Sequence, residues 1–170
     1  TSARFEGLLS SDDEWVERTD VWIHYMNRKG RLRAGYGVRE GFIGPELGFG
    51  HAVGDALQMP VLLIKICWGG KSLGADFRPP SAGGETGPFY SEMIERAKAA
   101  LADPGIEDLN GTEIELAGFG WHQGWNDRVN QQFVEEYASN LRHNIRDLRT
   151  DFDSPDSPFD IEEKVLTDWG

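Results

Sequence analysis

The chain of 170 residues contains a single cysteine and is poor in positive charge, with 17 Lys and Arg against 29 Asp and Glu. A single thiol excludes an internal disulfide. Because Cys67 ends the apolar run 61–67, we predict that it is a small core residue. The formal net charge of -12 disfavours nucleic acid as a partner, since phosphate binding depends on clustered cations.

The chain also lacks long apolar runs and paired histidines. No segment approaches the roughly 20 apolar residues that cross a bilayer, so we expect no membrane insertion. No two histidines lie four residues apart, and one cysteine cannot form a thiolate cluster, so we predict neither a metal nor another cofactor. The compartment and the oligomeric state stay undetermined.

The residues that are present alternate between strand-like and helix-like patterns. Residues 21–26, 61–67 and 114–121 are rich in β-branched and apolar side chains, which is typical of buried strands. Apolar residues at helical spacing lie between and after them. This order predicts an α/β fold, a three-layer α/β/α sandwich with a parallel sheet. The helical stripes are Phe49, Ala52, Val53 and Ala56 after Gly44-Pro45-Glu46; Tyr90, Met93, Ile94, Ala97 and Leu101; and Phe133, Tyr137, Leu141, Ile145 and Leu148.

The two ends of the chain lack such patterns. Residues 1–20 are mostly polar, and residues 153–170 begin with a run of Asp, Ser and Pro, so we predict an irregular N-terminal segment and a loop-like C-terminal tail. A single domain is predicted over residues 21–152, with a long surface loop at 28–41. Three strands make a narrow sheet, so this domain is expected to be incomplete.

Two loops after predicted strands contain candidate functional residues. The first holds Trp68, Gly69, Gly70, Lys71 and Ser72, whose glycines allow backbone N–H groups to form an anion-binding nest or a tight turn. A phosphate-binding P-loop is disfavoured because its first glycine is replaced by a lysine of the strand. No Gly-x-Ser-x-Gly elbow surrounds Ser72, so a turn role is favoured over a nucleophilic one.

The second loop has the sequence Trp-His-Gln-Gly-Trp-Asn-Asp at residues 121–127. It follows a predicted strand, and the carboxyl ends of strands in open α/β sheets are where ligands bind. The amide of Gln123 is suited to donate hydrogen bonds to a developing oxyanion, and Gly124 allows close approach of backbone. The loop contains no evident nucleophile.

Several segments resemble one known family, in the same order along the chain. Residues 121–127 resemble the Trp-x-Gln-Gly-x-x-Asp block of the sialate O-acetylesterase-like branch of the SGNH hydrolases, which are carbohydrate acetylesterases. Residues 43–47 resemble its Gly-Pro-Glu helix start, and residues 64–73 its second block. Residues 76–81 and 87–90 extend the resemblance, which covers residues 21–152.

This resemblance implies a flavodoxin-like SGNH fold and a serine esterase chemistry on acetylated carbohydrates. A serine attacks the acetyl carbonyl, a histidine held by a carboxylate takes the proton, and N–H donors stabilise the oxyanion. Gln123 matches the side-chain donor, and Gly69 or Gly70 matches a backbone donor. Residues for substrate contacts are then Trp68, Ser72, Arg78, Trp121, Trp125 and Asp127, of which the tryptophans offer either sugar-stacking planes or core packing.

The chain departs from the family pattern at two blocks. It contains no Gly-Gln-Ser-Asn, which carries the nucleophile, and no Asp-x-x-His, which carries the base. We therefore expect a fragment that holds the oxyanion part of an esterase and is inactive alone. The alternative is a non-catalytic module that binds glycans. Members of the family are often secreted or periplasmic, but the compartment of this chain is not predicted.

Other polar residues have plainer interpretations. His122 is favoured as a structural residue over a catalytic one, and His24, His51 and His143 as surface or packing residues. Glu46 is expected to interact with the helix dipole. Asp127 is predicted to cap the loop or the following helix, with an orienting role in the site as the alternative.

Overall fold

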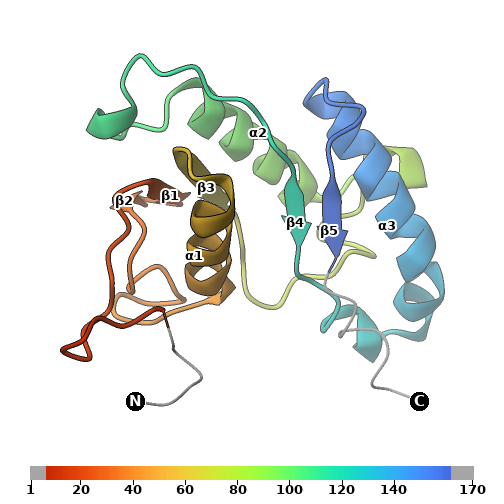
Figure 1. The fold of residues 1–170 in the computed structure, drawn as a ribbon. Helices are drawn as coiled ribbons and strands as arrows, with labels where there is room; N and C mark the ends of the chain where they lie inside the picture. Colours follow the sequence, from red (N-terminus) through yellow and green to blue (C-terminus); the bar gives the residue numbers. More distant parts are fainter. Residues whose placement is uncertain (1–6, 162–170) are drawn as a thin grey trace. The chain divides into compact units, whose positions relative to one another are not determined.

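The computed structural model describes residues 7–161 and shows an α/β structure (Figure 1). The chain divides into two compact units, Thr1–Ile66 with Ala102–Gly111 (unit 1) and Cys67–Leu101 with Thr112–Gly170 (unit 2). The α/β class predicted from the sequence is confirmed. Within the described part of the chain, no helix combines the length and the apolar character that crossing a bilayer requires.

Unit 1 contains a three-stranded mixed sheet in the order β2-β1-β3. Strand β1 (Val21–Tyr25) runs antiparallel to β2 (Arg28–Arg31) and parallel to β3 (Val61–Lys65). The prediction of a surface loop at 28–41 is therefore wrong for its first four residues. A two-residue turn with Met26 at φ 52° joins β1 to β2, and because methionine is unusual at such a position, the sequence contains no hairpin signal there.

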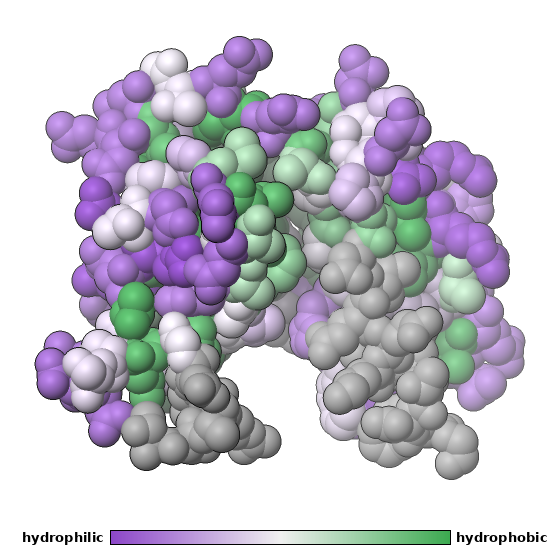
Figure 2. Space-filling model, viewed as in Figure 1, coloured by the Kyte–Doolittle hydropathy of each residue, from purple (hydrophilic) through white to green (hydrophobic). Residues whose placement is uncertain are grey.

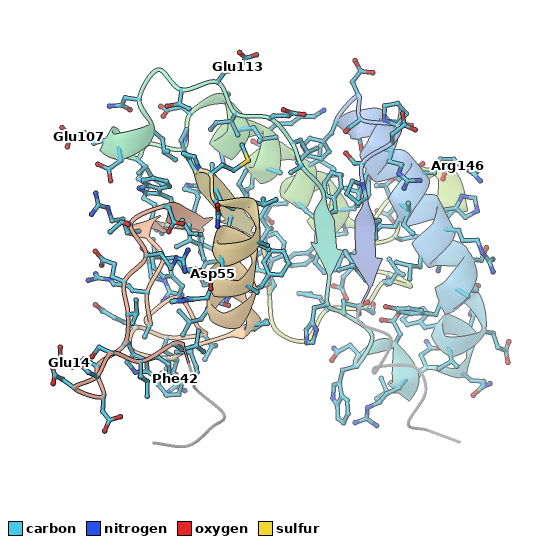
Figure 3. All side chains as sticks on the ribbon, in the orientation of Figure 1. Glu14, Phe42, Asp55, Glu107, Glu113 and Arg146 are labelled. Carbon is cyan, nitrogen blue, oxygen red and sulfur yellow. The ribbon has the colours of Figure 1, made fainter. Side chains whose placement is uncertain are left out.

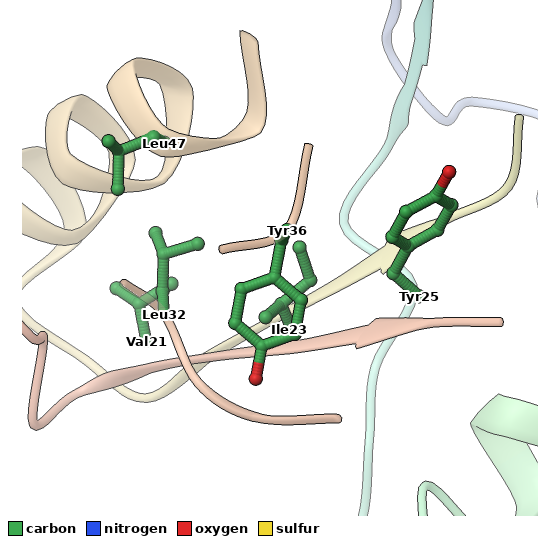
Figure 4. Close-up of a cluster of buried hydrophobic side chains, with 6 residues drawn as sticks. All are labelled: Val21, Ile23, Tyr25, Leu32, Tyr36 and Leu47. Carbon is green, nitrogen blue, oxygen red and sulfur yellow. The ribbon is translucent and has the colours of Figure 1, made fainter. Parts of the chain in front are cut away.

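The core of unit 1 lies between this sheet and helix α1 (Pro45–Leu57). Val21, Ile23, Leu32 and Tyr36 gather there with Leu47 from the helix (Figure 4). The helix approaches the sheet through small residues, since a Cβ at Gly50 would collide with the Leu32 side chain.

The helix itself was predicted, but the apolar stripe proposed for it is not its buried face. Phe49 is 52% exposed, and the alanines of that stripe, Ala52 and Ala56, are exposed as well. The buried positions of α1 are Glu46, Leu47, Gly50, His51 and Gly54. Two of these five are glycines and two are ionisable, so a search for apolar residues could not identify this face.

Unit 2 contains the short parallel pair β4 (Phe119–Trp121) and β5 (Phe159–Ile161) with helices α2 (Pro88–Ala102) and α3 (Gln131–Asp151). Its core is largely aromatic and includes Leu73, Phe77, Trp121, Tyr137 and Leu141. The predicted stripe of α3 is confirmed, since Tyr137, Leu141 and Leu148 are buried. Asn130 caps this helix by accepting hydrogen bonds from two backbone N–H groups.

Three further expectations need correction. The third strand was predicted over residues 114–121, but residues 114–118 have no ladder partner among the described residues and β4 begins only at Phe119. Its partner β5 lies in the tail predicted as a loop. Cys67 is exposed and is not a core residue. The described strands form two sheets, so the single parallel sheet of a three-layer sandwich, like the single domain over residues 21–152, remains a prediction.

Candidate functional site

Both candidate loops lie in unit 2, where side chains of the second loop form hydrogen bonds to the backbone of the first. The first loop comprises residues 68–74, and the second comprises residues 123–127. Hydrogen bonds between residues 52 to 54 positions apart in sequence join them. The two loops that contain the candidate residues are therefore hydrogen-bonded to each other.

Asp127 is the main link between the two loops. Its carboxylate is buried, with only 2% of the residue exposed, and accepts hydrogen bonds from the backbone N–H groups of Leu73 (2.9 Å) and Gly74 (2.8 Å). It accepts a third from Nε2 of Gln123 at 2.7 Å. Among the described residues no cation pairs with it, so N–H dipoles alone compensate its burial. Asp127 thus orders the loops from inside the unit.

Gln123 is held at every polar atom of its side chain. Nε2 donates to the carbonyl oxygen of Lys71 at 2.9 Å as well as to Asp127, so both hydrogens have an acceptor. Oε1 accepts from the hydroxyl of Tyr137 at 3.1 Å, and the same hydroxyl donates to the Gln123 carbonyl oxygen at 2.5 Å. This amide is pre-positioned at the junction of the loops, but it can donate to a ligand only by giving up one bond.

The two glycines sit at the exposed side of the first loop. Gly70 has φ 73°, a left-handed conformation that favours glycine, whereas a Cβ at Gly69 would meet no atom within 4 Å. The Nδ2 atom of Asn126 lies 3.7 Å from where a Cβ of Gly70 would stand. An amide side chain that was not among the predicted site residues thus lies beside the candidate backbone donors.

Ser72 is buried and bonded to a carboxylate. Its hydroxyl donates to Asp76 at 3.0 Å, and its backbone N–H donates to the same oxygen at 2.9 Å. Burial would raise the pKa of Asp76, but these bonds and the ammonium of Lys71 at 3.2 Å outweigh it and lower that pKa. The geometry is that of a turn serine, as the sequence favoured. Because Lys71 pairs with Asp76, its charge is already balanced, which disfavours a phosphate at this loop.

The three candidate tryptophans occupy different environments. Trp121 is buried, packs edge-to-face on Phe77, and its indole N–H donates to the Tyr137 hydroxyl at 3.3 Å. Trp68 is half-buried, with its ring 4.9 Å from that of Phe89 in a T-shaped arrangement. Trp125 is 57% exposed. Of the three, Trp125 presents the most surface to a ligand.

Arg128, three residues after Trp125, stacks its guanidinium on the exposed indole ring, 3.8 Å from the ring centre. The guanidinium of Arg78, by contrast, is engaged within unit 2. It pairs with Glu136 at 2.9 Å and donates to the carbonyl oxygens of Gly74 and Gly83. Arg78 therefore fixes the backbone that follows the first loop. Its hydrogen bonds are internal to unit 2, and the substrate contact predicted for it stays a prediction.

The histidines are spread over the molecule. His122 is exposed and His51 is buried on α1, where burial lowers its pKa. Burial also lowers the pKa of His24 in β1. His143 on α3 forms a hydrogen bond to the hydroxyl of Ser81 at 2.7 Å. Residues 7–161 contain no cluster of three or more His, Cys, Asp or Glu side chains that could hold a metal ion.

Sequence reasoning missed two residues that order the site. Burial raises the pKa of Tyr137 to about 12, with a further rise from the charge of Asp127 against the opposing bond from Trp121, so its phenol stays a donor to Gln123. Asp76 holds both polar groups of Ser72. Tyr137 had been assigned only to a helical core stripe, and nothing in the local sequence signals that its hydroxyl reaches a loop.

Comparison with known proteins gives a match to a family and similarity to solved structures. Residues 7–164 match the family described as "Carbohydrate esterase, sialic acid-specific acetylesterase". No protein of the curated set matches. A protein from Arabidopsis thaliana solved by X-ray crystallography at 1.6 Å has a similar structure, with a TM-score of 0.63 and 18% identity. The similarity covers 88% of this chain and 63% of the Arabidopsis chain, and at this identity it shows a shared fold alone.

Proposed function

This chain belongs to the sialic acid-specific acetylesterase family of carbohydrate esterases, and we propose on that premise that it supplies the oxyanion-stabilising part of a carbohydrate O-acetyl ester hydrolase. The observation that carries the proposal is the pair of loops fastened by Gln123 and Asp127. This fastening places an amide side chain and a glycine-rich backbone segment in one rigid arrangement, which is the requirement for stabilising a developing negative charge.

In the proposed reaction a serine oxygen attacks the carbonyl carbon of an acetyl ester and the carbonyl oxygen becomes negative. Gln123 donates an N–H to that oxygen after its bond to Lys71 opens, and the backbone N–H of Gly69 or Gly70 donates a second bond. Catalytic hydrogen bonds are often formed fully only in the complex with substrate. Loss of one such donor costs about 3 to 4 kcal/mol of transition-state stabilisation.

The proposal does not assign the nucleophile or the Asp/His pair to any of the 170 residues. Gly-Gln-Ser-Asn and Asp-x-x-His do not occur in the sequence. Ser72 is not assigned as the nucleophile, because its hydroxyl is buried and donates to Asp76. We expect no ester hydrolysis by this chain beyond the background rate.

We also propose that the described strands belong to the three-layer α/β/α sandwich of SGNH hydrolases. Two observations support this arrangement. Strands β1 and β3 are parallel neighbours with α1 between them in sequence, and β4 and β5 are parallel with α3 between them. A parallel pair needs a crossover connection of this kind, which is the building unit of such sandwiches.

A second candidate function is glycan binding without catalysis. The exposed ring of Trp125 favours it, because an aromatic plane offers apolar and C–H contacts to a sugar face, and Arg128 holds the ring by stacking on it. Trp125 also stands directly after Gly124 in the second loop. In this alternative the chain binds a glycan through this exposed ring and never acts on an ester.

Nuclear magnetic resonance titration separates the two functions. An O-acetylated oligosaccharide and its deacetylated counterpart are titrated into the chain while the N–H signals of Gly69, Gly70 and the Gln123 amide are followed. The proposal expects these signals to shift with the acetylated sugar only, and Gln123→Leu to abolish the difference. Equal shifts with both sugars, centred on Trp125, support the binding module. Turnover that Ser72→Ala removes would overturn both.

A further inference from the structure

Helix α3 carries a row of three arginines away from the candidate site. Arg142, Arg146 and Arg149 lie within about 60° of one another around the helix, because a residue turns the helix by about 100°. Figure 3 labels Arg146 on the outer side of α3, and this flank is hydrophilic in Figure 2. The row stands out because the chain as a whole has a net charge of -12.

Neighbouring side chains on the helix do not compensate this positive charge. The positions three and four residues from Arg142 hold Ala138, Ser139, Ile145 and Arg146, and none of these is acidic. Arg142 and Arg146 form no ion pair with the described side chains, which are those of residues 7–159. Like charges four residues apart destabilise a helix by about 0.2 to 0.5 kcal/mol. The repulsion between Arg142 and Arg146 is thus unfavourable for the helix, whereas Arg149 in the last turn is favoured by the helix dipole.

Several arginines elsewhere among the described residues form ion pairs. Arg96 on α2 pairs with Glu92 one turn earlier, and Arg78 pairs with Glu136. Arg18 lies between Asp20 and Asp55. With 29 acidic residues in the chain, pairing is the common outcome, and the row on α3 is an exception to it.

The three arginines line a hollow of about 700 Å³ together with residues of the turn after α3. Ile145 and Pro155 give it an apolar part, and Asp153 is the one carboxylate in its lining. Arg149 is anchored at one end by donating to the carbonyl oxygen of Ser157. The hydroxyl of Thr150, which also lines the hollow, already donates its hydrogen to the Arg146 carbonyl oxygen. The hydrogen-bond donors that can reach a ligand in the hollow are therefore the guanidinium groups.

We propose that this hollow binds an acidic oligosaccharide through its carboxylate groups, at a site distinct from the acetyl ester site. The planar guanidinium matches a carboxylate with two parallel hydrogen bonds. Arg142 and Arg146 are about 6 Å apart along the helix axis, and Arg149 lies about 4.5 Å further, so the row suits an extended ligand with several charges. The apolar part of the hollow suits the C–H faces of sugar rings.

The choice of a sugar as the ligand rests on the proposed function, whereas the anionic character rests on the arginines. A nucleic acid is disfavoured because, among the residues that the structure describes, no aromatic side chain lines the hollow to stack on bases. A single small anion does not explain three arginines spread along two turns of helix. The site serves to hold a charged polysaccharide on the protein.

Isothermal titration calorimetry with a fully de-esterified oligogalacturonate tests the proposal. A neutral xylo-oligosaccharide of the same length serves as the ligand control. We expect the acidic oligomer to bind with an affinity that falls as salt rises, and the neutral one not to bind. The double variant Arg142→Gln, Arg146→Gln should bind at least about tenfold more weakly. Arg142→Lys, Arg146→Lys should lie between, since lysine keeps the charge but not the bidentate geometry.

The matched protein control is Arg33→Gln, Arg39→Gln, which removes the same charge from unit 1 and should leave the affinity unchanged. Thermal unfolding of Arg142→Gln, Arg146→Gln should occur at or above the wild-type temperature, because like-charge repulsion is removed. Equal affinity of this variant and the wild type would overturn the proposal, as would equal weakening by the control. Tighter binding of a single-stranded oligonucleotide, or displacement by inorganic phosphate at similar concentration, would also overturn it.

These measurements are independent of ester hydrolysis, because the test ligand carries no acetyl group. Retained binding at the arginine row without any response of Gln123 to acetylated sugars would overturn the proposed function alone. The reverse result would overturn only the site on α3.

Discussion

The two units of this chain each contain a buried carboxylate, but the two carboxylates are stabilised differently. In unit 1, Glu46 pairs with the ammonium of Lys65 at 2.7 Å and accepts from the N–H of Gly44. In unit 2, Asp127 has no cation among the described residues and accepts three N–H bonds instead, two of them from backbone. One carboxylate forms a local ion pair, and the other organises two loops.

The difference indicates different roles. An ion pair of this kind can often be replaced by two apolar side chains at little cost in stability, because each charge is compensated mainly by the other. Glu46 also accepts from the Gly44 N–H, and Lys65 also donates to the Tyr36 carbonyl oxygen, so one backbone group on each side would lose its partner. A carboxylate that accepts from two buried backbone N–H groups without a cation cannot be removed in this way, since both backbone donors remain buried. Asp127 therefore determines the shape of the loops, whereas Glu46 and Lys65 stabilise the start of α1.

The largest expected effect follows from removing Asp127. Asp127→Ala leaves the N–H groups of Leu73 and Gly74 buried without an acceptor and releases Gln123, so we expect a loss of about 4 to 5 kcal/mol in the free energy of unfolding, measured with urea. Asp127→Asn should lose less, because one oxygen still accepts. A loss below about 1 kcal/mol for the alanine variant would show that Asp127 does not hold the loops.

The ion pair of unit 1 should respond differently to single and double substitution. Glu46→Met alone leaves Lys65 partly buried without its partner, and we expect a loss of about 3 kcal/mol. Adding Lys65→Met should recover at least half of that loss, as a double-mutant cycle of urea unfolding would measure. If the two single losses simply add, the pair is not coupled and the contrast with Asp127 disappears.

A smaller effect is expected from the hydroxyl of Tyr137. Tyr137→Phe removes the donor to Gln123 and should cost about 1 to 2 kcal/mol at neutral pH. The pKa of Tyr137 is about 12 when folded, above its usual value of 10.0, so the folded state holds the proton more tightly. The extra stability is complete below pH 10 and is lost as pH rises to about 12.

The variant therefore also predicts a change in pH dependence. Tyr137→Phe should reduce the decline of the free energy of unfolding above pH 10, measured by urea unfolding at several pH values. Some decline remains in the variant, because burial also raises the pKa values of Tyr36 and Tyr90. An unchanged decline would mean that Tyr137 is not buried as described.

The smallest effect concerns how the helices begin. Asn130 caps α3 with its side chain, and Asn130→Ala should cost about 1 kcal/mol in thermal or urea unfolding. The corresponding residue of α1 is Gly44, which has no side-chain cap, and its N–H is satisfied by Glu46. Asn130→Gly should be milder than alanine. An alanine variant as stable as the wild type would contradict this role of the cap.

Local patterns predicted most elements of the fold. The strands at 21–25 and 61–65 and all three helices were identified, because their residue types and periodicity act over a few residues. The hairpin strand β2 was missed, since its four residues have no apolar alternation and Met26 is not a usual turn residue. The third strand was predicted too long, because an apolar segment becomes a strand only where a partner is present.

Local patterns likewise predicted only part of the candidate site. The motif at 121–127 and the glycines at 69 and 70 identified two loops, and the structure joins those loops in unit 2. The structure gives Arg78 and Trp121 partners within unit 2, because one donates to backbone carbonyls and the other is buried in the core, and the substrate contacts predicted for them stay predictions. Exposure and bonding partners depend on residues far apart in sequence.

The sequence by itself determined the composition limits, the helices, two strands, and the family resemblance, since these depend on residue identity and short spacing. Only the tertiary structure decided that Asp127 binds the N–H groups of Leu73 and Gly74, that Tyr137 holds Gln123, and that the arginines of α3 line a hollow. The physical reason is that buried polar groups are stable only when they are hydrogen-bonded, and their partners here are residues far apart in sequence. Local sequence patterns do not show which distant residues the fold places within hydrogen-bonding distance.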